Sequence, residues 1–95
     1  FMVYFAPGAT HAPHHVSDEW IEKYRGKFDD GWDALRERTF ARQKELGVIG
    51  PDAELTARTV GIPAWDDMDD ELKPVLARQM EVYAGFKATG VRTYS

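Results

Sequence analysis

The chain opens with a continuous apolar run, Phe1–Ala6, which ends at Pro7 and Gly8. A short unbroken apolar run bounded by a turn is typical of a strand buried on both faces, as in a parallel sheet. The rest of the chain offers no second convincing strand, and a lone strand leaves its backbone N–H and C=O groups unpaired. We therefore expect this strand either to pair with another copy of the chain or, as we favour, to belong to the sheet of a larger protein.

Helical spacing dominates the remaining sequence. We expect a loop over residues 7–16 and helices over about residues 17–25, 30–46 and 73–86. Ser17 is placed to cap the first helix, and Asp29 or Asp30 the second, because short polar side chains accept hydrogen bonds from the first backbone N–H groups of a helix. Gly47 fits the left-handed position after the second helix, with Val48 folding back as in a Schellman ending.

The third helix carries the clearest apolar stripe, which we interpret as core packing. The stripe consists of Leu72, Leu76, Met80, Tyr83 and Phe86, spaced by three or four residues. Pro74 is compatible with a first turn only, so the helix should begin near Lys73 or kink there. Residues 48–65 show no consistent period and should form a surface loop. After Phe86 the sequence turns polar, and we expect the last residues to fray.

Composition narrows the classes of function. The chain has 95 residues, enough for one small domain, and its hydrophobic fraction of 43% argues against global disorder. Its 16 acidic and 12 basic side chains give a net charge of −4, which lacks the basic footprint of a nucleic-acid-binding protein. There is no cysteine, so disulfides, thiolate metal sites and cysteine nucleophiles are excluded.

Hydropathy gives no indication of a membrane partner. The longest apolar run is far shorter than the roughly 20 residues that a transmembrane helix needs. No basic region precedes an apolar stretch in the manner of a signal peptide. We accordingly expect neither nucleic acid nor a membrane segment among the partners of this chain.

All three histidines, His11, His14 and His15, lie in the loop that follows the predicted strand. In open α/β sheets, ligand sites form beyond the carboxyl ends of the strands. A histidine there can donate a hydrogen bond to an anion and can carry positive charge near neutral pH. On spacing alone, the simpler interpretation of such a residue is a polar loop histidine without a ligand.

Two possible metal sites are weighed and set aside. The three histidines have a spacing that suits a transition metal only on a helix, and Pro13 disfavours a helix there. A second group of acidic residues consists of Asp66, Asp67, Asp69, Asp70 and Glu71. It lacks the glycine and the spacing of an EF-hand loop, so we interpret it as an acidic approach to the third helix. No metal ligand is therefore predicted.

The segment Phe1–Pro13 resembles the strand and loop of arylsulfatases that end in a T-H-x-P signature. The resemblance continues through Trp20–Asp29. Further matching segments are Trp32–Arg36, Ala41–Gly47, Ile62–Trp65 and Ala77–Ala84. The resemblance covers about residues 1–86 in order, which is far more specific than one short motif.

The resemblance to type I sulfatases implies a fold and a reaction. The fold would be α/β: a fragment of an alkaline-phosphatase-like α/β sandwich, in which residues 1–95 form part of the catalytic domain as one buried strand followed by mostly helices and loops. The reaction would be the hydrolysis of sulfate esters, with a formylglycine nucleophile and a calcium ion. His11 stands where the family has a sulfate-contacting histidine, as a catalytic and substrate-binding residue. His14 and His15 are weaker candidates at the pocket mouth.

The chain also departs from the family pattern. Neither Ser17 nor Ser95 opens the C/S-x-P-x-R motif of the nucleophile, and the acidic cluster does not match the calcium-binding aspartates. Residues 87–95 do not follow the family either. We expect a sulfate ester and the remainder of the sulfatase domain as partners, no nucleophile or cofactor ligand in this chain, and an inactive isolated chain. The rival interpretation is a small helical binding module that uses residues 1–6 as an exposed strand.

Overall fold

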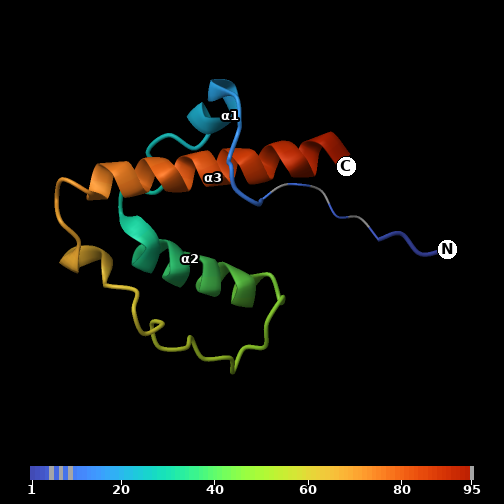
Figure 1. The fold of residues 1–95 in the computed structure, drawn as a ribbon. Coiled ribbons are helices and arrows are strands. Elements are labelled where there is room, and N and C mark those ends of the chain that lie inside the picture. The colour runs from blue at the N-terminus through green and yellow to red at the C-terminus, as the bar shows by residue number, and fades with distance from the viewer. Residues whose placement is uncertain (5, 7, 9, 95) are drawn as a thin grey trace.

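A computed structural model describes residues 1–4, 6, 8 and 10–94 of the chain. Its elements are α1 (Asp18–Glu22), α2 (Gly31–Glu45), the short 3₁₀ helix η1 (Trp65–Asp67) and α3 (Lys73–Tyr94). The long α3 runs through the middle of the molecule, with α1 on one side and α2 on the other (Figure 1). No helix in the described part of the chain combines the length and the apolar character that a bilayer span requires.

The buried strand expected over residues 1–6 is not confirmed. Residues 1–4 and 6 form neither helix nor strand, and Phe5 lies outside the described residues. The side chains of this segment are exposed, that of Phe1 to 120% and that of Val3 to 70%. A strand needs a neighbouring strand to pair its backbone groups, and the described residues form none. The α/β sandwich therefore stays an expectation that rests on the sulfatase resemblance, while the described residues form helices joined by loops.

The end of α2 follows the prediction closely. Gly47 adopts a φ of 71°, in the left-handed region. Its N–H donates to the carbonyl of Lys44 over 3.0 Å, and the N–H of Val48 donates to the carbonyl of Gln43 over 2.9 Å. These two bonds define the Schellman motif, so the predicted ending is confirmed.

The helix starts follow the prediction in position but not in chemistry. Ser17 and Asp30 occupy the N-cap positions of α1 and α2, yet neither side chain makes a capping hydrogen bond. Asp30 instead forms an ion pair with Arg38. The helix expected to reach residue 25 ends at Glu22, because the chain then tightens into turns whose bonds span three residues.

The last helix begins where expected and ends later. α3 starts at Lys73 with Pro74 in its first turn, where the missing N–H costs nothing. The helix expected to end near residue 86 instead continues to Tyr94. Once a helix is nucleated, each further residue adds a hydrogen bond at little cost. The hydroxyl of Thr89 also donates to the carbonyl of Gly85 over 2.9 Å, inside the helix.

The core is small and lies in two places. On one side α1 lies against α3: Ile21 and Ala77 are buried, and a Cβ on Gly85 would meet the backbone of Trp20 at 3.0 Å. On the other side Trp65 is 6% exposed. The radius of gyration is 15.7 Å, against about 12 Å for a compact domain of this length. Much apolar surface therefore stays uncovered within the described chain.

The long loop between α2 and η1 is fastened to α2 by three polar contacts. The Arg36 guanidinium donates to the carbonyl of Thr56 over 2.6 Å, and the indole N–H of Trp32 donates to the carbonyl of Pro63 over 3.1 Å. Arg58 forms an ion pair of 3.0 Å with Asp33. The loop is irregular, as its sequence indicates, but it lies along the helix rather than extending into solvent.

Trp65 closes this side of the molecule against the start of α2. Its ring lies at 4.8 Å from that of Trp32 in an edge-to-face arrangement. The backbone N–H of Trp65 donates to the carboxylate of Asp33 over 2.8 Å. This bond, together with the ion pair to Arg58, lowers the pKa of Asp33. The ring also covers Gly31, where an added Cβ would lie only 2.0 Å from it.

We expect Gly31→Ala to lower the free energy of unfolding by about 3 kcal/mol or more. A left-handed φ of 80° costs an L-residue roughly 1–2 kcal/mol, and overpacking adds about 1–3 kcal/mol. Gly47→Ala is the matched control, since Gly47 has a similar φ but open space around it. Gly47→Ala should lower the free energy of unfolding only by the roughly 1–2 kcal/mol that the left-handed φ costs. Urea unfolding followed by circular dichroism measures both, and equal losses would contradict the packing of Trp65 on Gly31.

Candidate functional site

The loop that carries the histidines is attached to α3. The hydroxyls of Thr10 and Tyr83 are 2.8 Å apart and form a hydrogen bond. The ring of His14 stands edge-on to that of Tyr83 at 5.3 Å and lies 5.6 Å from that of Phe86. Its Nε2 donates to the carbonyl of Thr10 over 3.2 Å. The loop is thus held at two points, one on each side of His11.

His11 itself is exposed, and its ring is oriented by the loop. Its Nδ1 lies 2.6 Å from the carbonyl oxygen of Ala12. A carbonyl only accepts, so Nδ1 is the protonated nitrogen in this hydrogen bond. The Nε2 atom can then donate to a ligand only when the ring is the imidazolium cation.

The two other histidines differ in their surroundings. His14 is engaged with α3, as described above, and lies at the edge of the groove between α2 and α3. His15 is exposed, and its backbone N–H donates to the carbonyl of Pro13 over 3.1 Å. In the described part of the chain, no group of three or more histidine, aspartate or glutamate side chains is arranged to hold a metal ion.

The acidic residues before α3 serve the local backbone. Asp69 accepts the N–H of Glu71 at 3.4 Å, and its carbonyl accepts the N–H groups of Leu72 and Lys73. Asp70 forms an exposed ion pair of 2.9 Å with Lys73. These contacts agree with an acidic approach to the helix, the interpretation that the sequence favoured over a calcium loop.

An apolar groove of about 1110 Å³ separates α2 from α3. It is lined by Phe28, Trp32 and Leu35 on the α2 side and by Pro74, Val75, Leu76, Arg78, Gln79, Met80, Val82, Tyr83, Ala84 and Lys87 on the α3 side, with His14 at its edge. Part of the stripe predicted as core thus faces an open groove. Leu72, at 48% exposure, and Tyr83, at 44%, depart most from that prediction.

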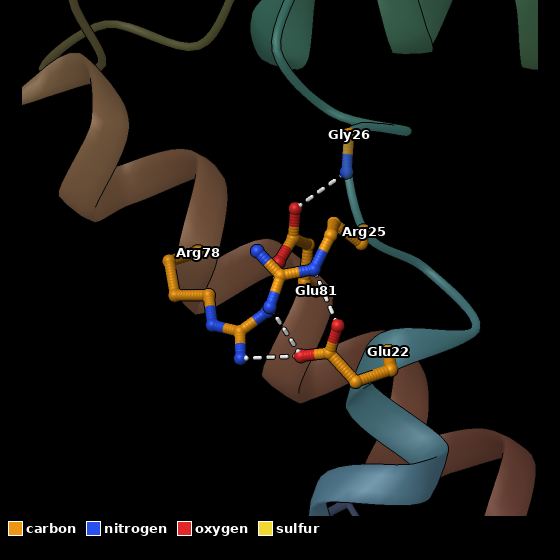
Figure 2. Close-up of polar contacts among 5 residues, drawn as sticks. All are labelled: Glu22, Arg25, Gly26, Arg78 and Glu81. Atoms are coloured by element: carbon orange, nitrogen blue, oxygen red, sulfur yellow. Dashed lines mark hydrogen bonds and ion pairs between the residues drawn. The ribbon is translucent and has the colours of Figure 1, made fainter.

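The strongest polar constellation joins α1 to α3 and was not predicted (Figure 2). Glu22 accepts hydrogen bonds from Arg25 on its own side and from Arg78 of α3, the latter over 3.0 Å. Arg78 also donates to Glu81 over 2.6 Å. Glu81, only 5% exposed, accepts the backbone N–H of Gly26 over 2.8 Å. Both carboxylates are fully occupied by partners of the same chain, so the cluster is built for cohesion.

The arginines of this cluster lower the pKa values of its two carboxyl groups. Hydrogen bonds from Arg25 and then Arg78 lower the pKa of Glu22 to about 2. Burial raises the pKa of Glu81, but the bonds from Arg78 and the Gly26 N–H outweigh it, and the net pKa is lowered. Both groups are therefore carboxylates throughout the neutral range and hold the arginines in place.

The sequence indicates the two local ion pairs of this cluster but not their meeting. Glu22 with Arg25, and Arg78 with Glu81, stand three residues apart, a spacing that brings side chains together on one helical turn. That the two pairs meet depends on where α1 crosses α3. Local spacing holds no information on that crossing.

Comparison with known proteins places the chain in a family. No family model matches it. An uncharacterised sulfatase of Schizosaccharomyces pombe is 40% identical over 86 residues, which cover 88% of this chain and 15% of the relative. An arylsulfatase of Klebsiella aerogenes is 31% identical over 80 residues, which cover 84% of this chain and 17% of the relative.

These matches confirm the resemblance seen in the sequence: the chain belongs to the sulfatase family. It spans about one sixth of the length of the curated relatives it matches. Such matches over most of the chain do not favour the rival interpretation, an independent helical binding module.

We expect the stability of the chain to fall in acid because of Glu22. Its pKa is lower folded (about 2) than unfolded (about 4.3), so the stabilisation is complete above the unfolded value and disappears as the pH falls towards the folded one. Glu22→Gln should flatten the decline of the melting temperature between about pH 5 and pH 2. Glu54→Gln, an exposed loop substitution, is the control and should leave the slope unchanged. An unaltered slope in Glu22→Gln would show that the cluster does not link α1 to α3.

Proposed function

We propose that this chain is a segment of an enzyme that hydrolyses sulfate esters, and that His11 contributes a hydrogen bond to the sulfate group. The observation that carries the proposal is the match to two sulfatases over most of the chain. The geometry of His11 is compatible with it. The Nδ1–Ala12 bond leaves Nε2 as the ring nitrogen for a ligand, and a cationic donor suits the singly charged sulfate group of a sulfate ester.

In this scheme His11 acts on charge rather than as a nucleophile. When the S–O bond of a sulfate ester breaks, negative charge builds up on the departing oxygen and redistributes among the oxygens that stay on sulfur. A preorganised N–H donor aimed at such an oxygen stabilises the transition state more than the ground state. The role of the protein at this residue is to hold the imidazolium Nε2 where that oxygen lies.

Formylglycine and calcium are features of the sulfatase family, and the residues of this chain do not fit either group. Neither serine lies in the motif of the nucleophile, and the described residues offer no set of metal ligands. We accordingly assign no step to these groups here. In the proposed enzyme they belong to other segments of the polypeptide.

The partner of this chain in the proposed enzyme is the remainder of the sulfatase domain. Two uncovered apolar surfaces support this: the groove between α2 and α3, and the exposed side chains of Phe1 to Tyr4. Burial of such surfaces against other parts of a longer chain is favourable by roughly 25 cal/mol per Å². The length of the relatives shows that a sulfatase supplies ample chain for it.

The proposal is tested in the protein encoded by the complete reading frame around this segment. We expect that frame to encode an upstream C/S-x-P-x-R motif and a downstream Asp-Asn pair, and the protein to hydrolyse 4-nitrophenyl sulfate. His11→Ala should lower kcat by about 100- to 1,000-fold, the effect of losing one oxyanion donor. Glu54→Ala, in the exposed loop, is the control. A frame without these motifs, or a His11→Ala enzyme with normal kcat, would refute the proposal.

The 95-residue chain alone should show no turnover of 4-nitrophenyl sulfate, with or without added calcium, because it lacks a nucleophile. The Klebsiella arylsulfatase in the same assay serves as the positive control. Calcium-dependent turnover by the purified chain would mean that a nucleophile exists among its own residues and that the assignment of His11 as a supporting donor is wrong.

A further inference from the structure

We infer that Tyr83 of α3 is a positioning residue for His11, an inference that rests on the proposed sulfate contact and adds a residue to it. His11 makes no side-chain bond to a helix in the contacts described; its ring bonds only to the adjacent Ala12 carbonyl. The position of its ring therefore depends on what fixes the loop around it. Tyr83 is the residue of α3 that touches the loop on both sides of His11.

Each contact of Tyr83 uses a different part of the side chain. The hydroxyl forms the 2.8 Å bond with Thr10, the residue directly before His11. The ring meets the edge of His14 at 5.3 Å, three residues after His11. The bond from His14 Nε2 to the carbonyl of Thr10 closes the loop between these two points. Phe86, one helical turn further along α3, adds a second surface for His14.

Tyr83 stands on a long helix that is itself attached to α1. It lies within the 22-residue α3, near the point where α1 is fastened by the Glu22–Arg78–Glu81 contacts. A donor must lie close to its ideal place to act on a transition state, and a displacement of about 1 Å can cost on the order of 100-fold in rate. Holding the loop on a helix is an efficient means of limiting such displacement.

The contacts also explain why Tyr83 stands in the apolar stripe of α3 without being buried. A core residue would gain from full burial, whereas Tyr83 is 44% exposed and uses its hydroxyl on the loop. Phenylalanine would fill the same stripe position equally well. The hydroxyl is therefore the part of the residue that the packing of α3 does not account for.

Two substitutions isolate that hydroxyl. Tyr83→Phe retains the ring and its contact with His14 but removes the bond to Thr10, and Thr10→Val removes the partner hydroxyl with little change of shape. Tyr24→Phe is the matched control, because it deletes a hydroxyl from a tyrosine whose described contacts are made by its ring, with Phe28 and Lys27. If the bond acts as described, the double variant Tyr83→Phe/Thr10→Val should lose no more than either single variant.

The measurements are made by NMR on the isotope-labelled protein encoded by the complete reading frame around this segment. Backbone ¹⁵N relaxation reports the order of the His11 amide, and titration with sodium sulfate at constant ionic strength reports binding through the His11 ring signals. We expect both hydroxyl variants to lower the order of the His11 amide and to weaken sulfate binding about three- to tenfold, the range for one hydrogen bond. The melting temperature and the order of α3 should not change, and Tyr24→Phe should behave as wild type.

The outcomes separate this inference from the proposed function. An absent nuclear Overhauser contact between the rings of His14 and Tyr83 in the wild-type chain overturns the inference, as does unchanged His11 order in Tyr83→Phe. A loss of order without any loss of sulfate affinity also overturns it, since the loop would then be held for another reason. If the His11 signals of the wild type ignore sulfate, the sulfate contact fails instead, and the relaxation data still decide whether Tyr83 holds the loop.

Discussion

The crossing of α1 over α3 is the contact on which the rest of this structure depends. It is close because Gly85 has no side chain to hold the helices apart, and a Cβ there would meet the backbone of α1. Ile21 of α1 and Ala77 of α3 are both buried. The carboxylate of Glu81 adds a polar part, since it accepts the N–H of Gly26 and so fixes the turn at which the chain leaves α1 (Figure 2).

This crossing sets the direction of the chain at both ends of α1. On the N-terminal side, the chain reaches α1 only after the histidine loop has lain along the same helix, at Tyr83 and Phe86. On the C-terminal side, the turns after α1 lead to Gly31, where α2 starts beneath the ring of Trp65. One helix, α3, thus serves as the support for both the histidine loop and α1 (Figure 1). The groove between α2 and α3 remains open.

The open groove and the small core agree with the place of the chain in its family. The segment spans about one sixth of the length of the relatives it matches, and in the proposed enzyme most of its packing partners would lie elsewhere in the polypeptide. Apolar side chains that would be buried there are exposed here, from Phe1 to Tyr4 and along the groove. The contacts internal to the segment are instead strongly polar, as the carboxylates of Glu22 and Asp33 show.

The sequence by itself determined what depends on neighbouring residues. Helical spacing located α2 and α3, Pro74 marked the first turn of α3, and Gly47 with Val48 specified a Schellman ending, because each of these is decided within a few residues. The family could also be identified from the sequence, since several segments match it in the same order along the chain. The histidine loop was visible as the place for an anion, although its role stays a proposal.

Only the tertiary structure decided which distant residues meet. The two ion pairs of Glu22 and Glu81 were each readable at a spacing of three, but their union through Arg78 requires the α1–α3 crossing. The same holds for the hydroxyl of Tyr83, which the stripe on α3 assigned to the core and the structure assigns to Thr10. Contacts across 55 or 73 residues of sequence leave no periodic trace, because their partners are brought together by the path of the chain and not by local geometry. The strand expected at the N-terminus illustrates the converse: an apolar run predicts burial, but burial requires a neighbour, and the described residues provide no strand for it.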